Sequence, residues 1–337
     1  MPVDPWTPGA LRPPSSSYHP LDRTWTEAAP PRRTRSPLRL HLMLFALTVL
    51  STWMVQALGT GGWSWIYAFY YVGQGGDAGL MVVRFFDALA KGASAGFEYS
   101  FWLLFILTSH EFGHYFAAKA HRVKATLPYF IPLPLPPLGT MGAVIRMSAY
   151  IPNRRALFDI AVAGPLAGIV VALPVAWFGI RQAVHAPVQA LAGGSLYFGD
   201  PLIFRIFEYF TLGPRPEGYE LLIGPMAFAG WVGCFVTALN LLPISQLDGG
   251  HISYAVFGSW SRKVATAVFV GMGVMMLFNG PSYILILALA WFAGIGHPPT
   301  MDDSVKLGPK RVALAWLALV IFILCFTPTP MAEWQGQ

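Results

Sequence analysis

The sequence predicts an all-α polytopic membrane protein, with about seven spanning helices and a re-entrant or membrane-associated β-hairpin loop. Of its 337 residues, 55% are hydrophobic and only 11% are charged, whereas soluble globular proteins carry about 25% charged residues. Several apolar stretches are long enough to cross a hydrocarbon core, which takes about 20 helical residues. Much of this chain therefore cannot face water, and its length does not require a second folded domain.

The N-terminal tail differs in composition from the rest of the chain. Residues 1–39 contain many prolines and several arginines but few large aliphatic side chains. Such a segment buries too little apolar area to offset the entropy lost on ordering, so we expect a disordered cytosolic tail. A secretory signal peptide would reach its apolar stretch sooner. We therefore interpret residues 40–59 as a spanning anchor and residues 40–337 as a membrane domain.

Seven apolar stretches predict the spanning helices. They are residues 40–59, 99–119, 158–179, 222–243, 264–279, 282–296 and 312–328. The stretch 62–97 is ambiguous, because it begins with an aromatic-rich run but then carries two acidic and two basic residues. We interpret it as interfacial or partly re-entrant rather than as a further span.

The distribution of basic residues supports this arrangement. Lysines and arginines gather before the first span, after the second, and before the third, fifth and seventh. With seven spans, all of these clusters fall on one side of the membrane, as the positive-inside rule requires of cytosolic loops. We therefore expect the N-terminus in the cytosol and the protein in a bacterial cytoplasmic membrane. No basic helix, zinc knuckle or aromatic stacking motif indicates a nucleic-acid partner.

The sharpest chemical feature is His110-Glu111-Phe112-Gly113-His114, inside the second predicted span. Residues four apart share one face of a helix, so the two imidazoles can bind one Zn²⁺. Glu111 lies beside them and can take a proton from water at the metal. Ionisable groups are costly in a spanning helix and mark a functional site. The alternative is a pair of histidines that hydrogen-bond to neighbouring helices, with Glu111 as a buried partner.

A catalytic zinc site usually has three protein ligands and one open position, so a third ligand must lie elsewhere. No Asp or Glu occurs between the two-histidine motif and Asp159. Asp159 falls in the first turn of the third span, where the helix dipole stabilises a carboxylate, so a structural role is favoured. Asp248 is the remaining candidate. Pro243 interrupts the helix before it, and two glycines after it permit a tight turn; a polar turn leaving the membrane is the alternative.

Four blocks of sequence together resemble the site-2 protease family of intramembrane zinc metalloproteases. They are HEFGH, LPYFIPLPLPPLGTMGAVIRM, FDIAVAGPLAG and NLLPISQLDGGH, all within a catalytic core of about residues 99–260. The resemblance implies a zinc-dependent endopeptidase that cleaves membrane-spanning proteins inside the bilayer or at its edge. The chain is similar to the compact form of the family, which lacks a PDZ-like or nucleotide-sensing domain.

The resemblance also implies roles for individual residues. His110, His114 and Asp248 would bind Zn²⁺, and Glu111 would be the general base. Asn240 would hold the substrate backbone or the developing oxyanion, to which an Asn amide can donate. An interhelical hydrogen bond is the alternative for Asn240.

The segment from Leu138 to Met147 resembles the membrane-associated hairpin of the family. Residues 139–142 would form its tight turn, and GAVIRM could pair with an unwound substrate as an added strand. The preceding proline-rich stretch cannot be regular helix or central strand. Gly164 and Gly168 fit close helix packing around the site.

The expected partners are the lipid bilayer and a single-span membrane protein, whose helix must unwind locally because helical hydrogen bonds shield its peptide bonds. Two other functions fit the composition. A catalytically inactive pseudoprotease would bind spanning helices without cutting them, but every expected ligand is present. A metal transporter would carry ionisable residues along several helices, whereas here they concentrate in two motifs. The observations favour the protease.

Overall fold

The structure is a computed structural model that describes most of the chain after the N-terminal tail. The described residues are 37–60, 71, 73–148, 150–188, 196–244, 246–280, 283–284, 287–288, 291, 294 and 296–333. The predicted disordered tail, most of the predicted sixth span and the first part of the ambiguous stretch lie outside these residues.

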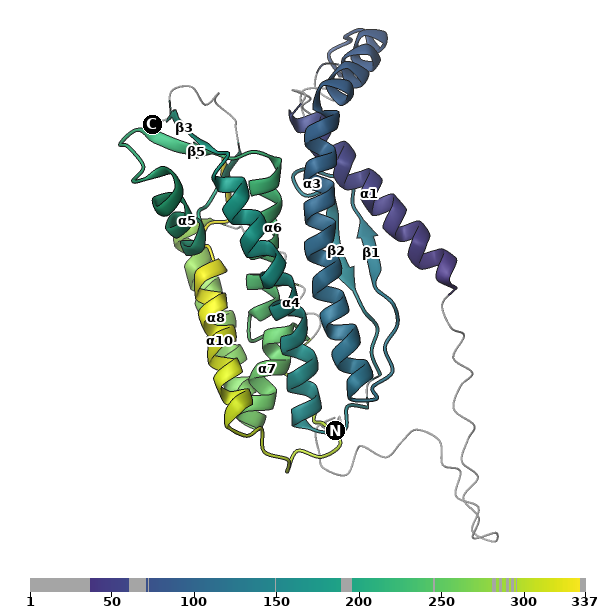
Figure 1. Cartoon of the computed structure of the whole chain (residues 1–337), viewed down its shortest axis with the longest axis vertical. Helices are drawn as coiled ribbons and strands as arrows, with labels where there is room; N and C mark the ends of the chain where they lie inside the picture. The colour runs from purple at the N-terminus through teal and green to yellow at the C-terminus, as the bar shows by residue number, and fades with distance from the viewer. Residues whose placement is uncertain are drawn as a thin grey trace. The chain divides into compact units, whose positions relative to one another are not determined.

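Helices make up most of the described chain (Figure 1). In order they are α1 (Leu38–Thr60), α3 (Ala78–Ala120), α4 (Arg154–Ile180), α5 (Leu202–Leu212), α6 (Pro225–Leu241), α7 (Asp248–Phe257), α8 (Ser261–Asn279) and α10 (Pro309–Cys325), with a 3-10 turn η2 (Gly258–Trp260) between α7 and α8. Six of the seven predicted spans coincide with a helix; the sixth lies largely outside the described residues.

Three helical stretches are long and apolar enough to cross a membrane. They are α1, α4 and the combined stretch Asp248–Phe278, and α6 is a shorter apolar helix. These helices indicate a membrane protein, and the full number of about seven spans stays a prediction.

The first half of α3 differs from the expectation. Residues 78–97 are helical and continuous with the second predicted span, so a re-entrant path is wrong for this part. The Asp77 side chain caps the helix by accepting the N–H of Gly79 at 2.7 Å. Asp87 and Lys91 form an exposed ion pair one turn apart, at 2.6 Å. The charges thus lie on the exposed face of a helix about 65 Å long, twice the thickness of a hydrocarbon core.

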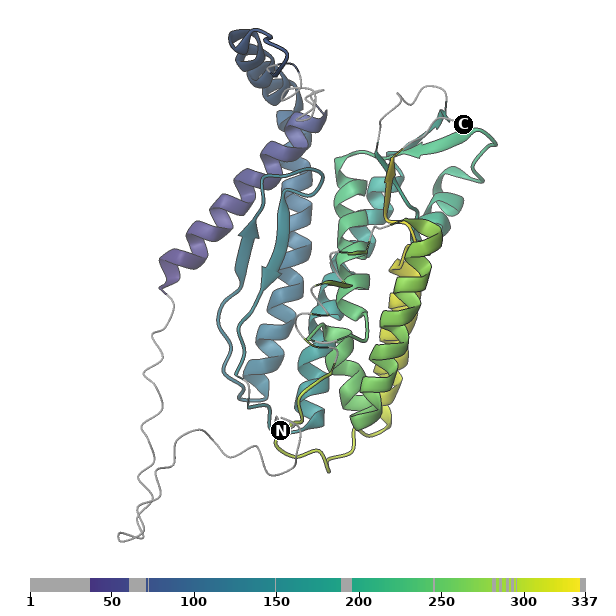
Figure 2. The same cartoon turned by 180° about the vertical axis from the view of Figure 1, so that it is seen from behind.

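The hairpin is present, but its turn is not where the sequence predicts it. β1 (Tyr129–Pro132) and β2 (Thr140–Val144) pair antiparallel and pack against α1 and α3 (Figures 1 and 2). The turn comprises residues 133–139, and most of the predicted turn, residues 139–142, belongs to β2. Prolines lack the N–H that a strand pair needs, so the proline-rich stretch forms the connection. Gly139 closes it with φ +76°.

α4 lies in the middle of the bundle, where it packs against α3, α6 and α7. Asp159 in its second turn has the structural role predicted. Its two carboxylate oxygens accept the Arg311 guanidinium of α10 at 2.7 Å each, and His121 beyond α3 lies 2.9 Å away. The end of α3 and the starts of α4 and α10 therefore meet at one end of the bundle, together with the basic residues that flank them.

The opposite end of the bundle is covered by short strands that the sequence analysis did not predict. β3 (Val184–Pro187) pairs with β5 (Tyr219–Leu222), and β4 (Leu196–Phe198) pairs with β6 (Met331–Glu333). Strands of three or four residues carry too little alternation of polar and apolar positions to be recognised in a sequence.

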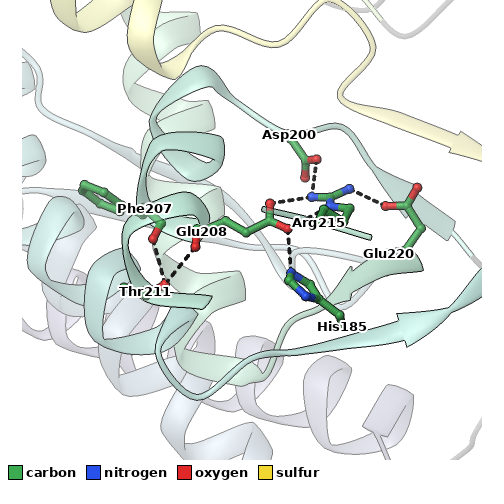
Figure 3. Close-up of polar contacts among 7 residues, drawn as sticks. All are labelled: His185, Asp200, Phe207, Glu208, Thr211, Arg215 and Glu220. Carbon is green, nitrogen blue, oxygen red and sulfur yellow. Dashed lines mark hydrogen bonds and ion pairs between the residues drawn. The ribbon is translucent and has the colours of Figure 1, made fainter. Parts of the chain in front are cut away.

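A cluster of polar side chains ties β3, β5 and α5 together at this end (Figure 3). Arg215 donates to Asp200 at 2.7 Å, to Glu208 at 2.8 Å and to Glu220 at 2.6 Å, and His185 lies 2.9 Å from Glu208. Burial acts to raise the pKa of Glu208, but hydrogen bonds from Arg215 and His185 outweigh it, so this pKa lies below its ordinary value. Arg215 therefore compensates carboxylates that are largely withdrawn from water.

Replacing Arg215 by Ala is expected to loosen this end of the bundle. The change leaves three neighbouring carboxylates without their cation, and removing one partner of a buried ion pair costs about 3 kcal/mol. Local opening should increase about 100-fold, measured as the rate of limited proteolysis within residues 200–222. Arg205→Ala is the matched control, since its exposed guanidinium forms no ion pair among the described residues. Equal proteolysis rates in the two variants would contradict the stabilising role.

Candidate metal centre

The three predicted metal ligands lie together inside the bundle. His110 and His114 are one turn apart on α3, and Asp248 is the first residue of α7. The Nε2 atom of His114 lies 3.2 Å from Nε2 of His110 and 3.2 Å from Oδ2 of Asp248. The His110 Nε2 to Asp248 Oδ2 distance is 3.4 Å. Three donor atoms from two distant parts of the sequence thus form a nearly equilateral triangle.

This triangle has the dimensions of a zinc site. Zinc binds nitrogen and oxygen ligands at about 2.0–2.2 Å in tetrahedral sites, which places neighbouring donor atoms about 3.3 Å apart. The observed sides match one face of such a tetrahedron. Among the described residues, this is the one group of three His, Cys, Asp or Glu side chains that could hold a metal ion.

A backbone carbonyl on the side of the ring away from the donor triangle fixes the orientation of His114. Its Nδ1 lies 2.7 Å from the backbone carbonyl of Ile160 on α4. Because a carbonyl can only accept, Nδ1 carries the proton and Nε2 keeps its lone pair for a metal. Partners of this kind orient metal-binding histidines and raise their basicity.

Glycines on α4 allow the two imidazoles to lie against its backbone, as the sequence predicts. A Cβ added at Gly164 would lie 2.1 Å from His114 Nε2, and one at Gly168 would lie 3.1 Å from His110 Nδ1. On the facing helix, a Cβ at Gly113 would lie 2.4 Å from the Ala163 carbonyl oxygen. The site therefore requires α3 and α4 to pack without side chains between them.

The variant Gly164→Ala is expected to weaken zinc binding by at least about 10-fold, the lower end of the effect of disturbing a ligand's surroundings. The added methyl group must displace the imidazole of His114, or α4 must move away. Zinc content after dialysis against a weak chelator measures the effect. Gly271→Ala on α8 is the control, because no atom lies within 4 Å of its added Cβ. Full zinc retention by Gly164→Ala would show that this packing does not support the site.

Glu111 is buried beside the triangle but is not part of it. The backbone N–H of Ile145, the residue that follows β2, lies close to the Glu111 carboxylate. The hairpin therefore leads directly to Glu111, although the two are 34 positions apart in the sequence.

Asn240, in the last turn of α6, also reaches the site. Its Nδ2 lies 3.3 Å from Nε2 of His110. A ring nitrogen that binds a metal cannot at the same time accept a hydrogen bond, so the amide of Asn240 would then be available to another acceptor. The observed contact joins α6 to α3 and is the interhelical hydrogen bond given as the alternative for Asn240; a role toward substrate stays a prediction.

The backbone before Asp248 breaks at Pro243 as predicted, but the glycines after Asp248 have another role. α6 ends at Leu241, and α7 begins at Asp248 itself, so Gly249 and Gly250 are helical rather than part of a turn. A Cβ at Gly249 would lie 2.0 Å from the Leu241 carbonyl oxygen. Gly249 therefore lets α7 pack against the end of α6. This packing holds Asp248 at a fixed position relative to α6.

A second polar cluster near the site was not predicted from the sequence. His251 Nδ1 lies 2.5 Å from His297 Nε2, and Tyr254 donates to Asp303 at 2.5 Å. Two ligands of one zinc ion would be about 3.3 Å apart, so the histidine contact is a hydrogen bond rather than half of a metal site. The spacing of His251 from Asp248, one helical turn, is the signal that could have revealed it. These bonds join α7 to the segment that precedes α10.

Comparison with known proteins places this site in a family. Residues 98–280, more than half of the chain, match the family described as peptidase family M50. The chain belongs to peptidase family M50. This finding confirms the resemblance to site-2 proteases, and the matched residues include all four blocks that carry it. No solved structure matches the chain.

The curated relatives of this M50 family member include plant proteins. The chain is 32% identical over 256 residues to "Probable zinc metalloprotease EGY1, chloroplastic" of Arabidopsis thaliana, covering 72% of this chain and 44% of the relative. It is 31% identical over 248 residues to "Probable zinc metalloprotease EGY3, chloroplastic" of Oryza sativa subsp. indica, covering 67% and 41%. The chain thus spans less than half the length of these relatives.

Proposed function

We propose that this member of family M50 is a zinc-dependent intramembrane endopeptidase that cleaves single-span membrane proteins. The observation that carries the proposal is the triangle of donor atoms from His110, His114 and Asp248, with Glu111 buried beside it. The names of the relatives, probable zinc metalloproteases, agree with a protease and with zinc as its metal.

The residues have distinct tasks in this proposal. His110, His114 and Asp248 would hold the zinc ion, which when bound supplies Lewis acidity toward water and a peptide carbonyl. Glu111 accepts the proton of the attacking water and returns it to the departing amine. Asn240 donates a hydrogen bond to the carbonyl oxygen as negative charge develops there.

The depth of the site supports cleavage within the bilayer or at its edge. His110 and His114 lie ten and six residues before the end of α3, which corresponds to about 15 and 9 Å along the helix. The basic residues that flank this end of the bundle mark the membrane surface on that side. A peptide bond reaching the donor triangle must therefore enter the hydrocarbon region.

The free edge of β2 provides a way to bind an extended substrate. In the described part of the chain, β2 pairs with β1 alone, and strand addition to an open edge uses main-chain hydrogen bonds. Because β2 leads to Glu111, a segment paired with it would pass the proposed general base. A spanning helix must unwind before it can bind in this way.

Substrate helices with weak points should accordingly be cut faster. Replacing a glycine or proline near the cut site by leucine strengthens the helix by about 1 kcal/mol or more. Cleavage should slow about 5-fold or more per replacement, measured by fragment formation in proteoliposomes. The same replacements ten residues away from the cut site are the control. Rates that do not depend on position would contradict the need for local unwinding.

We propose that the protein is an integral membrane protein with several spans. Its N-terminal tail would lie on the side of the membrane where the basic residues gather. The relatives are named as chloroplastic, so the comparisons do not support the bacterial cytoplasmic membrane expected from the sequence. The inactive and transporter alternatives gain no support from the described residues, in which a complete ligand set lies next to a carboxylate.

The direct test of the proposal uses the purified full chain with a single-span substrate. Discrete fragments cut within the span are expected, their formation should stop on removal of metal by a chelator, and zinc should restore it. Cleavage that continues in a preparation shown to be free of metal would overturn the proposal, as would the absence of any cleavage by zinc-loaded protein across a panel of substrate helices.

A further inference from the structure

The helix that carries Asp248 is held at its far end by α4. The guanidinium of Arg154, the first residue of α4, donates from Nε to the carbonyl of Ala255 and from Nη2 to the carbonyl of Val256, each at 2.9 Å. These carbonyls lie in the last turn of α7, where helical carbonyls have no partner within the helix. A cation there also complements the negative end of the helix dipole. Arg154 thus caps α7 through a planar two-point contact.

α4 is also the frame on which the two histidines are placed. The Ile160 carbonyl orients His114, and Gly164 and Gly168 accept the two imidazoles against the backbone. Ile160 lies six residues after Arg154 on the same helix. α4 therefore influences the position of all three donor groups. It contacts the two histidines directly and acts on Asp248 through α7.

α7 is well suited to transmit this contact. It has ten residues, and the carbonyl of Ala255 is about 10 Å along the helix from Asp248. A helix this short is not stable alone, so its position depends on its anchors. At its first turn Gly249 packs on the end of α6, and at its last turn Arg154 fixes its tilt relative to α4.

We propose that Arg154 is a positioning residue for the metal centre: by binding the last carbonyls of α7, it sets the place of Asp248 relative to His110 and His114. The inference rests on the proposed zinc site. Arg155 provides the contrast, because this neighbouring residue donates to the carbonyl of Lys306 at 2.7 Å and forms no hydrogen bond with α7 among the described residues.

Zinc affinity of the purified full chain, measured by competition with a chelating dye, tests this role. Arg154→Met should bind zinc about 10- to 100-fold more weakly, the effect typical of disturbing the partners of a ligand. Arg154→Lys keeps the charge but cannot donate to both carbonyls in the same planar geometry, so it should fall between wild type and Arg154→Met. Arg155→Met should bind zinc like the wild type.

Thermal unfolding of the metal-free proteins separates positioning from general stability. A purely structural role would lower the unfolding temperature of Arg154→Met and leave the zinc affinity of the folded protein unchanged, which would overturn the inference. Should Arg154→Met not fold, Arg154→Lys decides: wild-type affinity in that variant would also overturn it. Failure of the wild type itself to bind zinc would instead refute the proposed function.

Discussion

The variant Glu111→Gln is expected to cleave a single-span substrate 10²- to 10⁴-fold more slowly than the wild type, the range supplied by a general acid–base group. Gln has nearly the same volume but cannot take up the proton of water. Because Glu111 lies beside the donor triangle and not in it, zinc content should be unchanged. The rate of fragment formation and the metal content of the same preparation give both results.

The control for this variant is Glu98→Gln, between three and four turns earlier on the same helix. It removes the same charge from α3 at a distance from the site, and its cleavage rate should equal that of the wild type. A Glu111→Gln enzyme that cuts as fast as Glu98→Gln would remove Glu111 from the mechanism.

The variant Asp248→Ala is expected to lose zinc almost completely. It removes one of three donor atoms, so the affinity should fall by more than about 100-fold, the upper end of the effect of changing a ligand's partners. Dye competition at equal protein concentration measures the change.

Asp159→Asn is the matched control for Asp248→Ala. Asp159 is the other carboxylate that the sequence offers as a candidate third ligand. It contacts Arg311 and His121 and is not part of the donor triangle. This variant should lose stability but keep its zinc. If Asp248→Ala retained zinc while Asp159→Asn lost it, the ligand assignment would be wrong.

Long apolar stretches and short chemical motifs were the parts of this protein that the sequence predicted well. A spanning helix must be about 20 apolar residues long, so α1 and α4 could be located to within a few residues. His110 and His114 are four residues apart, so they share a face as soon as this segment is helical. Asp248 could be found because acidic residues are scarce in the apolar part of the chain.

Other features depend on contacts that no local pattern encodes. The first half of α3 carries three charged residues between 78 and 97, and its helical state rests on packing against α1, where a Cβ at Gly92 would lie 1.9 Å from the Ala57 carbonyl oxygen. The position of the hairpin turn depends on which backbone N–H and C=O groups can pair between the two strands. The roles of Arg154 and of the Ile160 carbonyl involve backbone oxygens, whose chemistry is the same at every residue and therefore leaves no mark in the sequence.

Anomalous scattering from crystals of the zinc-loaded protein, recorded on both sides of the zinc absorption edge, would show directly which residues hold the metal. We expect one strong peak about 2.0–2.2 Å from His110 Nε2, His114 Nε2 and an oxygen of Asp248. A peak held by other residues, such as His251 and His297, or a zinc ion bound by the two α3 histidines with Asp248 turned away, would contradict it.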